Sequence, residues 1–114
     1  MAAASDKAHL RSSPRFAVSS RCSIFYEDKM YKALVQDLSD GGMLLMCNLD
    51  FEPGAIVGVH LDLSAGVSID CEVEVRNSGD MGIGVKIDFM DAQNRKTYQS
   101  YLQEALSSQL NKLG

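Results

Sequence analysis

Apolar and polar residues alternate along three stretches in the second half of the chain. In residues 67–75, valine, isoleucine and cysteine occupy every other position, with serine, aspartate and glutamate between them. A period of two residues is typical of a β-strand that buries one face. Residues 55–64 and 81–89 alternate in the same way, and the short segments SAG and NSGD separate the three stretches. The pattern predicts three strands joined by hairpins.

Three further strands are predicted upstream. Residues 17–26 and 30–38 are rich in strand-forming residues and flank a turn-like segment, and the short apolar run 43–47 follows. Short connections favour antiparallel neighbours, and six twisted strands of this length tend to close on themselves. We therefore expect an all-β fold with a C-terminal helix, built as a six-stranded antiparallel β-barrel.

The period changes near the C-terminus, which predicts an amphipathic helix over 91–112. Asp91 is a good N-cap, and no glycine or proline interrupts the segment. The residues that recur at three- and four-residue steps are Tyr98, Tyr101, Leu102, Ala105, Leu106, Leu110 and Leu113. We favour a helix that covers an open end of the barrel, with a docking surface for a partner as the alternative.

Length and composition indicate one soluble domain. The chain has 114 residues, of which 46% are hydrophobic and 23% charged, which fits one globular core. We expect a flexible segment over residues 1–13, which contains few large apolar side chains, and a single domain over 14–114. The sequence has neither a run of about 20 apolar residues nor a signal peptide, so we expect a cytoplasmic protein, monomeric and without membrane insertion.

Charge and reactive residues argue against several functions. The net charge of −4 disfavours nonspecific binding to a nucleic acid polymer. Cys22, Cys47 and Cys71 form no CxxC motif and are interpreted as small buried hydrophobes. Neither His9 nor His60 has partners placed for acid–base catalysis. We therefore expect no enzyme activity, no metal and no cofactor. The glycines of GIGVKI are expected to let a neighbouring chain or a ligand approach closely.

Two arginines, Arg11 and Arg15, precede the first predicted strand in the segment RSSPR. A guanidinium group donates hydrogen bonds in a fork that suits phosphate oxygens and also the O6 and N7 acceptors of guanine. Taken alone, an RxxxR pattern is weak, and two solvated surface charges are the favoured interpretation of it. Its significance depends on a second motif.

That second motif is DLSDGG, which has the form DxSxxG and supplies Asp37, Ser39 and Gly42 after one hairpin. Asp37 and Ser39 lie two residues apart, so in extended chain they face the same side. A carboxylate accepts hydrogen bonds from guanine N1 and N2, a hydroxyl adds another, and glycine lets a base approach the backbone. The alternative is a turn whose Asp and Ser side chains cap their own backbone.

RxxxR followed by DxSxxG, with six strands and a C-terminal helix, resembles the PilZ domain family from Leu10 onward. The resemblance implies a β-barrel that binds cyclic di-GMP without turning it over. Arg11 and Arg15 would clasp phosphates and guanine edges, and the DxSxxG residues would line the guanine pocket. Leu10, just before the first arginine, implies one nucleotide per chain. Secondary candidates are Gly41, which also suits the turn, and Arg76, which with Arg21 and Lys7 can add positive charge.

The functional hypothesis is a cyclic di-GMP receptor that changes its N-terminal segment and surface on binding and signals to a protein partner. One alternative is a PilZ-like interaction module that does not bind nucleotide. A barrel that binds single-stranded nucleic acid is weaker, because the chain has no tryptophan and few aromatic residues in its predicted strands.

Overall fold

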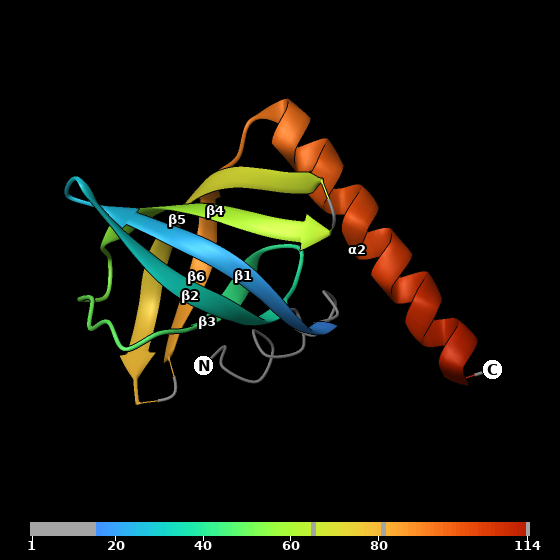
Figure 1. Ribbon diagram of the computed structural model, residues 1–114, viewed down its shortest axis with the longest axis horizontal. Helices are drawn as coiled ribbons and strands as arrows, with labels where there is room; N and C mark the ends of the chain where they lie inside the picture. The colour runs from blue at the N-terminus through green and yellow to red at the C-terminus, as the bar shows by residue number, and fades with distance from the viewer. Residues whose placement is uncertain (1–15, 65, 81, 114) are drawn as a thin grey trace, which may run out of the picture.

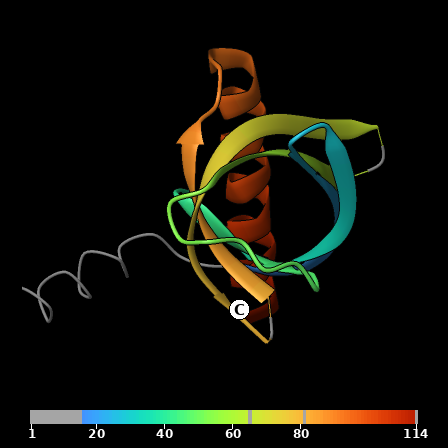
Figure 2. The same ribbon diagram turned by 90° about the vertical axis from the view of Figure 1, so that its left-hand side faces the viewer.

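The computed structural model describes residues 16–64, 66–80 and 82–113. Within these ranges the chain forms, in order, β1 (Phe16–Tyr26), β2 (Lys29–Leu38), β3 (Gly42–Met46), β4 (Ile56–Ser64), β5 (Val67–Gly79), β6 (Gly82–Phe89) and α2 (Ala92–Leu113) (Figure 1). The strands close into a barrel in the order β1-β2-β3-β6-β5-β4, and each is antiparallel to its neighbours. The predicted six-stranded barrel with a C-terminal helix is confirmed. Figure 2 shows the ring of strands viewed from one end, with α2 behind it.

The core fills the inside of this ring. In β5 the side chains of Ile69, Cys71, Val73 and Val75 are buried, whereas those of Asp70 and Glu72 are exposed, as the alternation predicted. The same division in the other strands produces one apolar cluster. Burial of this continuous interior is the main favourable contribution to folding.

Two pairings of the barrel, β3–β6 and β1–β4, are made by strands that no hairpin joins, and the ring closes only when both are formed. Gly82 has a φ of +136°, and a Cβ atom at this position would collide with the backbone carbonyl of Leu45 in β3. Glycine is required here because both the dihedral and the close approach exclude a side chain. The expectation that the GIGVKI glycines admit a neighbouring chain is thus confirmed at Gly82.

Different elements close the two ends of the barrel. At one end, Phe51 from the loop between β3 and β4 makes edge-to-face contacts with Tyr26 and Tyr31, with ring centroids 5.1 and 6.5 Å away. At the other end, α2 buries Tyr98 and Leu102 in the core. The interpretation that the helix covers an open end of the barrel is confirmed for this part of its apolar stripe. No helix in the described ranges is long and apolar enough to cross a membrane.

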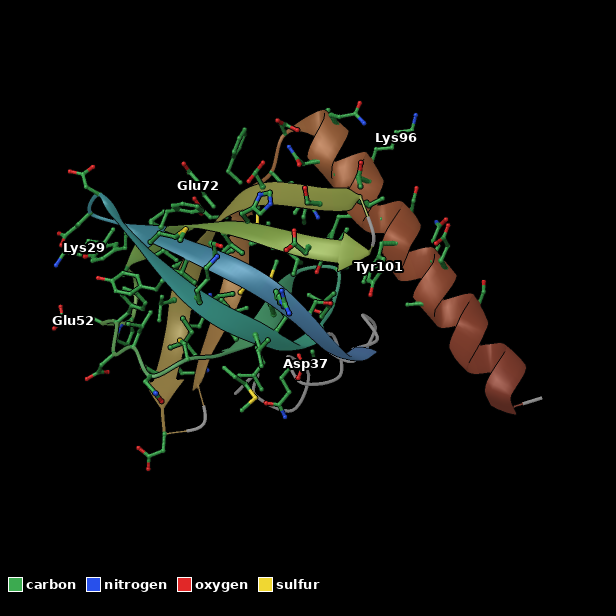
Figure 3. The ribbon with its side chains drawn as sticks, viewed as in Figure 1. Lys29, Asp37, Glu52, Glu72, Lys96 and Tyr101 are labelled. Atoms are coloured by element: carbon green, nitrogen blue, oxygen red, sulfur yellow. The ribbon has the colours of Figure 1, made fainter. Side chains whose placement is uncertain are left out.

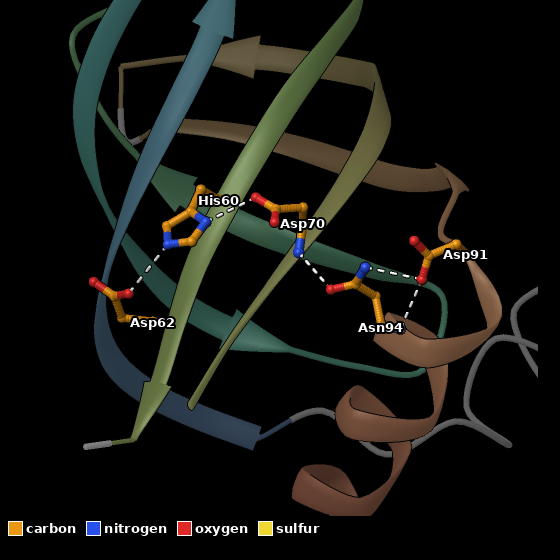
Figure 4. Close-up of polar contacts among 5 residues, drawn as sticks. All are labelled: His60, Asp62, Asp70, Asp91 and Asn94. Carbon is orange, nitrogen blue, oxygen red and sulfur yellow. Dashed lines mark hydrogen bonds and ion pairs between the residues drawn. The ribbon is translucent and has the colours of Figure 1, made fainter. Parts of the chain in front are cut away.

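A chain of polar contacts ties the start of α2 to the barrel (Figure 4). Asp91 accepts hydrogen bonds from the backbone and side-chain nitrogens of Asn94, at 2.8 and 2.9 Å, which confirms it as the N-cap. Both hydrogen bonds hold the pKa of Asp91 below its ordinary value, and the one from the Asn94 backbone has the larger effect. Asn94 in turn accepts a 2.9 Å hydrogen bond from the backbone of Asp70, whose carboxylate contacts His60 at 2.7 Å. The helix therefore begins at a fixed position against β5.

Two of the three cysteines are buried and the third is partly buried. Cys22 and Cys71 point into the barrel, and burial raises the pKa of each thiol from 9.0 to about 12. Cys47, just beyond β3, is half-buried. The interpretation of the cysteines as small buried hydrophobes is correct for Cys22 and Cys71 and only partly so for Cys47.

We expect the free energy of unfolding to decrease as the pH rises from about 9 to about 12. Above pH 9 the unfolded chain loses the protons of Cys22 and Cys71, whereas the folded protein keeps them until about pH 12. Below pH 9 this contribution to stability is fully present. Urea denaturation at a series of pH values measures the effect. The Cys22→Ala/Cys71→Ala variant is the control, and an equally steep loss of stability in that variant would rule out the thiols as its cause.

Candidate ligand-binding site

The DxSxxG motif lies where β2 turns into β3, at the helix end of the barrel. Asp37 is half-buried near the end of β2, and its Cα pairs with Ala17 in β1 and Leu44 in β3. The β2–β3 register shifts just before Asp37. Such a bulge changes the direction of the side chains that follow it. In Figure 3, Asp37 lies toward α2, and Lys29 and Glu52 lie at the opposite end.

Ser39 takes part in the turn that its own motif forms. Its side chain is only 5% exposed, and its hydroxyl donates to the carbonyl of Gly42 at 3.3 Å. Its backbone N–H donates to the same carbonyl at 2.9 Å. The turn-capping alternative is therefore correct for the Ser39 hydroxyl.

Gly42 has a structural role that the sequence did not reveal. A Cβ atom at Gly42 would lie 2.5 Å from the carbonyl oxygen of Val85 in β6, which is too close for any side chain. Gly42 therefore admits the neighbouring strand, in addition to any ligand. Gly41 differs, because it is exposed, a Cβ there would meet nothing within 4 Å, and its φ is not positive.

Three successive carbonyls of the motif loop are held by donors from other elements. The Tyr98 hydroxyl donates to Ser39 O at 2.6 Å, and an Arg95 guanidinium nitrogen donates to Asp40 O at 3.3 Å. The backbone N–H of Ile87 donates to Gly41 O at 2.8 Å. None of these three contacts was predicted from the sequence. The available signal was that a buried tyrosine needs a hydrogen-bond partner for its hydroxyl.

The chain enters the barrel beside this loop. Phe16, the first described residue, pairs with Leu38, and Ala17 pairs with Asp37. Leu10, Arg11 and Arg15, the candidates from the first motif, lie outside the described residues. The pairing of β1 with β2 places Phe16, the residue that follows RxxxR in sequence, next to the DxSxxG loop.

A groove of about 760 Å³ crosses β1, β2 and β3 next to the motif strands. The charged residues that line it are Arg21, Lys32, Asp62 and Asp80, and the apolar side chains of Leu34 and Met46, which are half-exposed, lie beside them. For Arg21, the sequence favoured a solvated surface charge over a contribution to ligand binding, and Lys32 was not considered. Arg76 is exposed on β5 at a shift in the β5–β6 register. In the described ranges, no three or more His, Cys, Asp or Glu side chains gather as a metal site.

The fold and the loop define a class of small β-barrel domain with a C-terminal helix and a polar loop between its second and third strands. A family model described as the PilZ domain matches residues 9–104. The chain belongs to the PilZ domain family, so the resemblance noted in the sequence is confirmed. No match was found among curated proteins.

Solved structures show the same fold at low sequence identity. The Bacillus subtilis inhibitor of motility MotI/DgrA is 21% identical, with a TM-score of 0.71 over 90% of this chain and 52% of that protein. MrkH of K. pneumonia, solved in complex with c-di-GMP, is 19% identical, with a TM-score of 0.74 over 88% and 53%. The PilZ domain of CeSA from a cellulose-synthesising bacterium is 12% identical, with a TM-score of 0.63 over 85% and 99%. This chain thus spans about half the length of MotI and MrkH.

Gly42→Ala is expected to destabilise the fold by about 1–3 kcal/mol, because the added methyl group would push β3 away from the Val85 carbonyl. Gly41→Ala is the matched control, with open space and no positive φ, and should change stability by less than about 0.5 kcal/mol. Urea denaturation of both variants measures the difference. Equal stability of the two would show that the β3–β6 contact imposes no constraint.

Proposed function

We propose that this protein is a receptor for cyclic di-GMP, which it binds without chemical conversion. The observation that carries the proposal is the pairing of Phe16 with Leu38 and of Ala17 with Asp37. Arg15 is one peptide bond from Phe16, and consecutive Cα atoms are about 3.8 Å apart. The start of β1, which directly follows RxxxR in sequence, therefore lies beside the DxSxxG motif, although more than twenty residues separate the two segments in sequence.

The chemistry of the two motifs is complementary around a guanine nucleotide. The Asp37 carboxylate would accept from guanine N1 and N2, and Ser39 would add a hydrogen bond beside Gly42. Arg11 and Arg15 would donate to phosphates and to the O6 and N7 edge of guanine. Each motif thus binds the part of the ligand that the other does not. Leu10 favours one nucleotide per chain.

Ligand binding would also change the surface of the protein, which is the basis for a signal. Fixing the segment that carries Arg11 and Arg15 costs conformational entropy, and charge-assisted hydrogen bonds to a dianion can offset this cost. The new surface would be recognised by a downstream protein, so the chain would act as an adaptor. The ligand shifts the equilibrium only by its differential affinity for the closed arrangement.

Arg15→Ala and Asp37→Ala are each expected to weaken cyclic di-GMP binding at least about tenfold, or about 1.4 kcal/mol, because each removes a charge-assisted interaction. Isothermal titration calorimetry measures affinity and stoichiometry together. We expect one nucleotide per chain. Two nucleotides per chain would refute the interpretation of Leu10 without affecting the receptor itself.

Lys29→Ala and Glu52→Ala are the matched controls, because they remove the same charges at the opposite end of the barrel (Figure 3). They should bind as the wild type does. Absence of heat and of chemical-shift change in the wild type, with ligand in the tens-of-micromolar range, would eliminate the receptor proposal.

A nucleotide-free interaction module is the second candidate, and one observation favours it. Phe25 and Met30 are 46% and 51% exposed, and they are direct cross-strand partners next to the β1–β2 turn. Adjacent exposed apolar side chains are common in protein contacts. The same titration separates the candidates, because this module would give no heat with cyclic di-GMP.

A further inference from the structure

The loop that carries Ser39 is attached to the C-terminal helix as well as to the barrel. Tyr98 and Arg95 lie three residues apart on α2, so they project from one face of the helix. They donate to the carbonyls of Ser39 and Asp40, two consecutive residues of DxSxxG. Together they hold this part of the loop from the helix side.

The Tyr98 contact has the properties of a strong, permanent restraint. The Tyr98 side chain is 0% exposed, and its oxygen lies 2.6 Å from the Ser39 carbonyl oxygen. A buried polar group deprived of its partner costs free energy, so this hydrogen bond is kept as long as the helix is seated. The position of Ser39 therefore depends on the position of α2.

The helix is itself fixed at its start. Asn94, the residue before Arg95 on the helix, accepts a hydrogen bond from the backbone N–H of Asp70 in β5. Leu102, one turn beyond Tyr98, is buried in the barrel core. Because the helix is anchored on both sides of Tyr98, a displacement of the helix would also displace the Ser39 carbonyl to which Tyr98 is bonded.

We propose that Tyr98 and Arg95 are positioning residues of the ligand site, and that seating of α2 on the barrel sets the affinity of DxSxxG for its nucleotide. This inference rests on the proposed function. Coupling between two sites is reciprocal. If seating of the helix raises the affinity for nucleotide by some factor, bound nucleotide raises the equilibrium constant for seating of the helix by the same factor. A protein that pulls α2 away would weaken nucleotide binding, and nucleotide would oppose that protein.

Tyr98→Phe tests the proposal, because it keeps the buried ring and removes only the hydroxyl. We expect cyclic di-GMP to bind about fivefold more weakly, the effect of one net hydrogen bond. Tyr101→Phe is the matched control: Tyr101 lies on the same helix, is half-buried, and makes no hydrogen bond to a described residue. It should bind as the wild type does. Calorimetry is done well below the unfolding temperature of each variant, so lower stability alone does not change the affinity.

Hydrogen exchange provides a second readout. Nucleotide should slow exchange of the α2 amides around Leu102 in the wild type and in Tyr101→Phe, and much less in Tyr98→Phe. Arg95→Lys should retain more affinity than Arg95→Ala, because lysine keeps a donor for the Asp40 carbonyl. Unchanged affinity in Tyr98→Phe, or helix exchange that does not respond to nucleotide in the wild type, would overturn the coupling.

The same variants separate this proposal from the receptor proposal. If the wild type binds no cyclic di-GMP, the receptor proposal fails, and the positioning role is then tested without ligand. Exchange at the amides of Asp40 and Gly41 should be faster in Tyr98→Phe than in Tyr101→Phe. Equal exchange rates in the two variants would show that the hydroxyl does not hold the loop.

Discussion

Closure of the barrel between β3 and β6 is the contact on which the other features of this protein depend. Together with the β1–β4 pairing it joins the first three strands to the last three, and neither of these pairings is supplied by a hairpin. The two backbones approach so closely that Gly42 and Gly82 cannot carry side chains. Without this seam the sheet would have two exposed edges and an open core.

The candidate site is built from the residues that make the seam. Gly42 ends the DxSxxG motif and is also the first residue of β3, and the Gly41 carbonyl accepts a hydrogen bond from Ile87 in β6. Ser39 is held to Gly42 on one side and to Tyr98 on the other. A motif that the sequence presents as a polar turn is therefore part of the closure of the barrel. Because the same backbone serves both roles, folding preorganises the DxSxxG part of the candidate site.

The strands could be predicted because each buries one face, so alternation along the sequence records directly which side chains point inward. The N-cap of α2 was predictable for a similar reason, because Asp91 acts on a backbone donor three residues away. Tyr98 could not be distinguished from Tyr101, since both fit the apolar stripe and only the packed helix decides which hydroxyl reaches Ser39. Phe51 was missed because its role depends on aromatic partners in β1 and β2, far away in sequence.

The net charge of the chain is a poor guide to the proposed ligand. Charges separated by more than about 8 Å are largely screened at physiological ionic strength, so a dianion responds to its immediate surroundings. Glu52 lies at the end of the barrel away from α2 (Figure 3), while Arg21 and Lys32 line the groove across β1, β2 and β3 together with the carboxylates of Asp62 and Asp80. In the described ranges, neither of these two cations makes an ion pair, so a ligand would not first have to break one. An acidic protein can therefore present cations locally, and the salt dependence of anion binding at this groove would reflect the balance of its two cations and two carboxylates and not the total of −4.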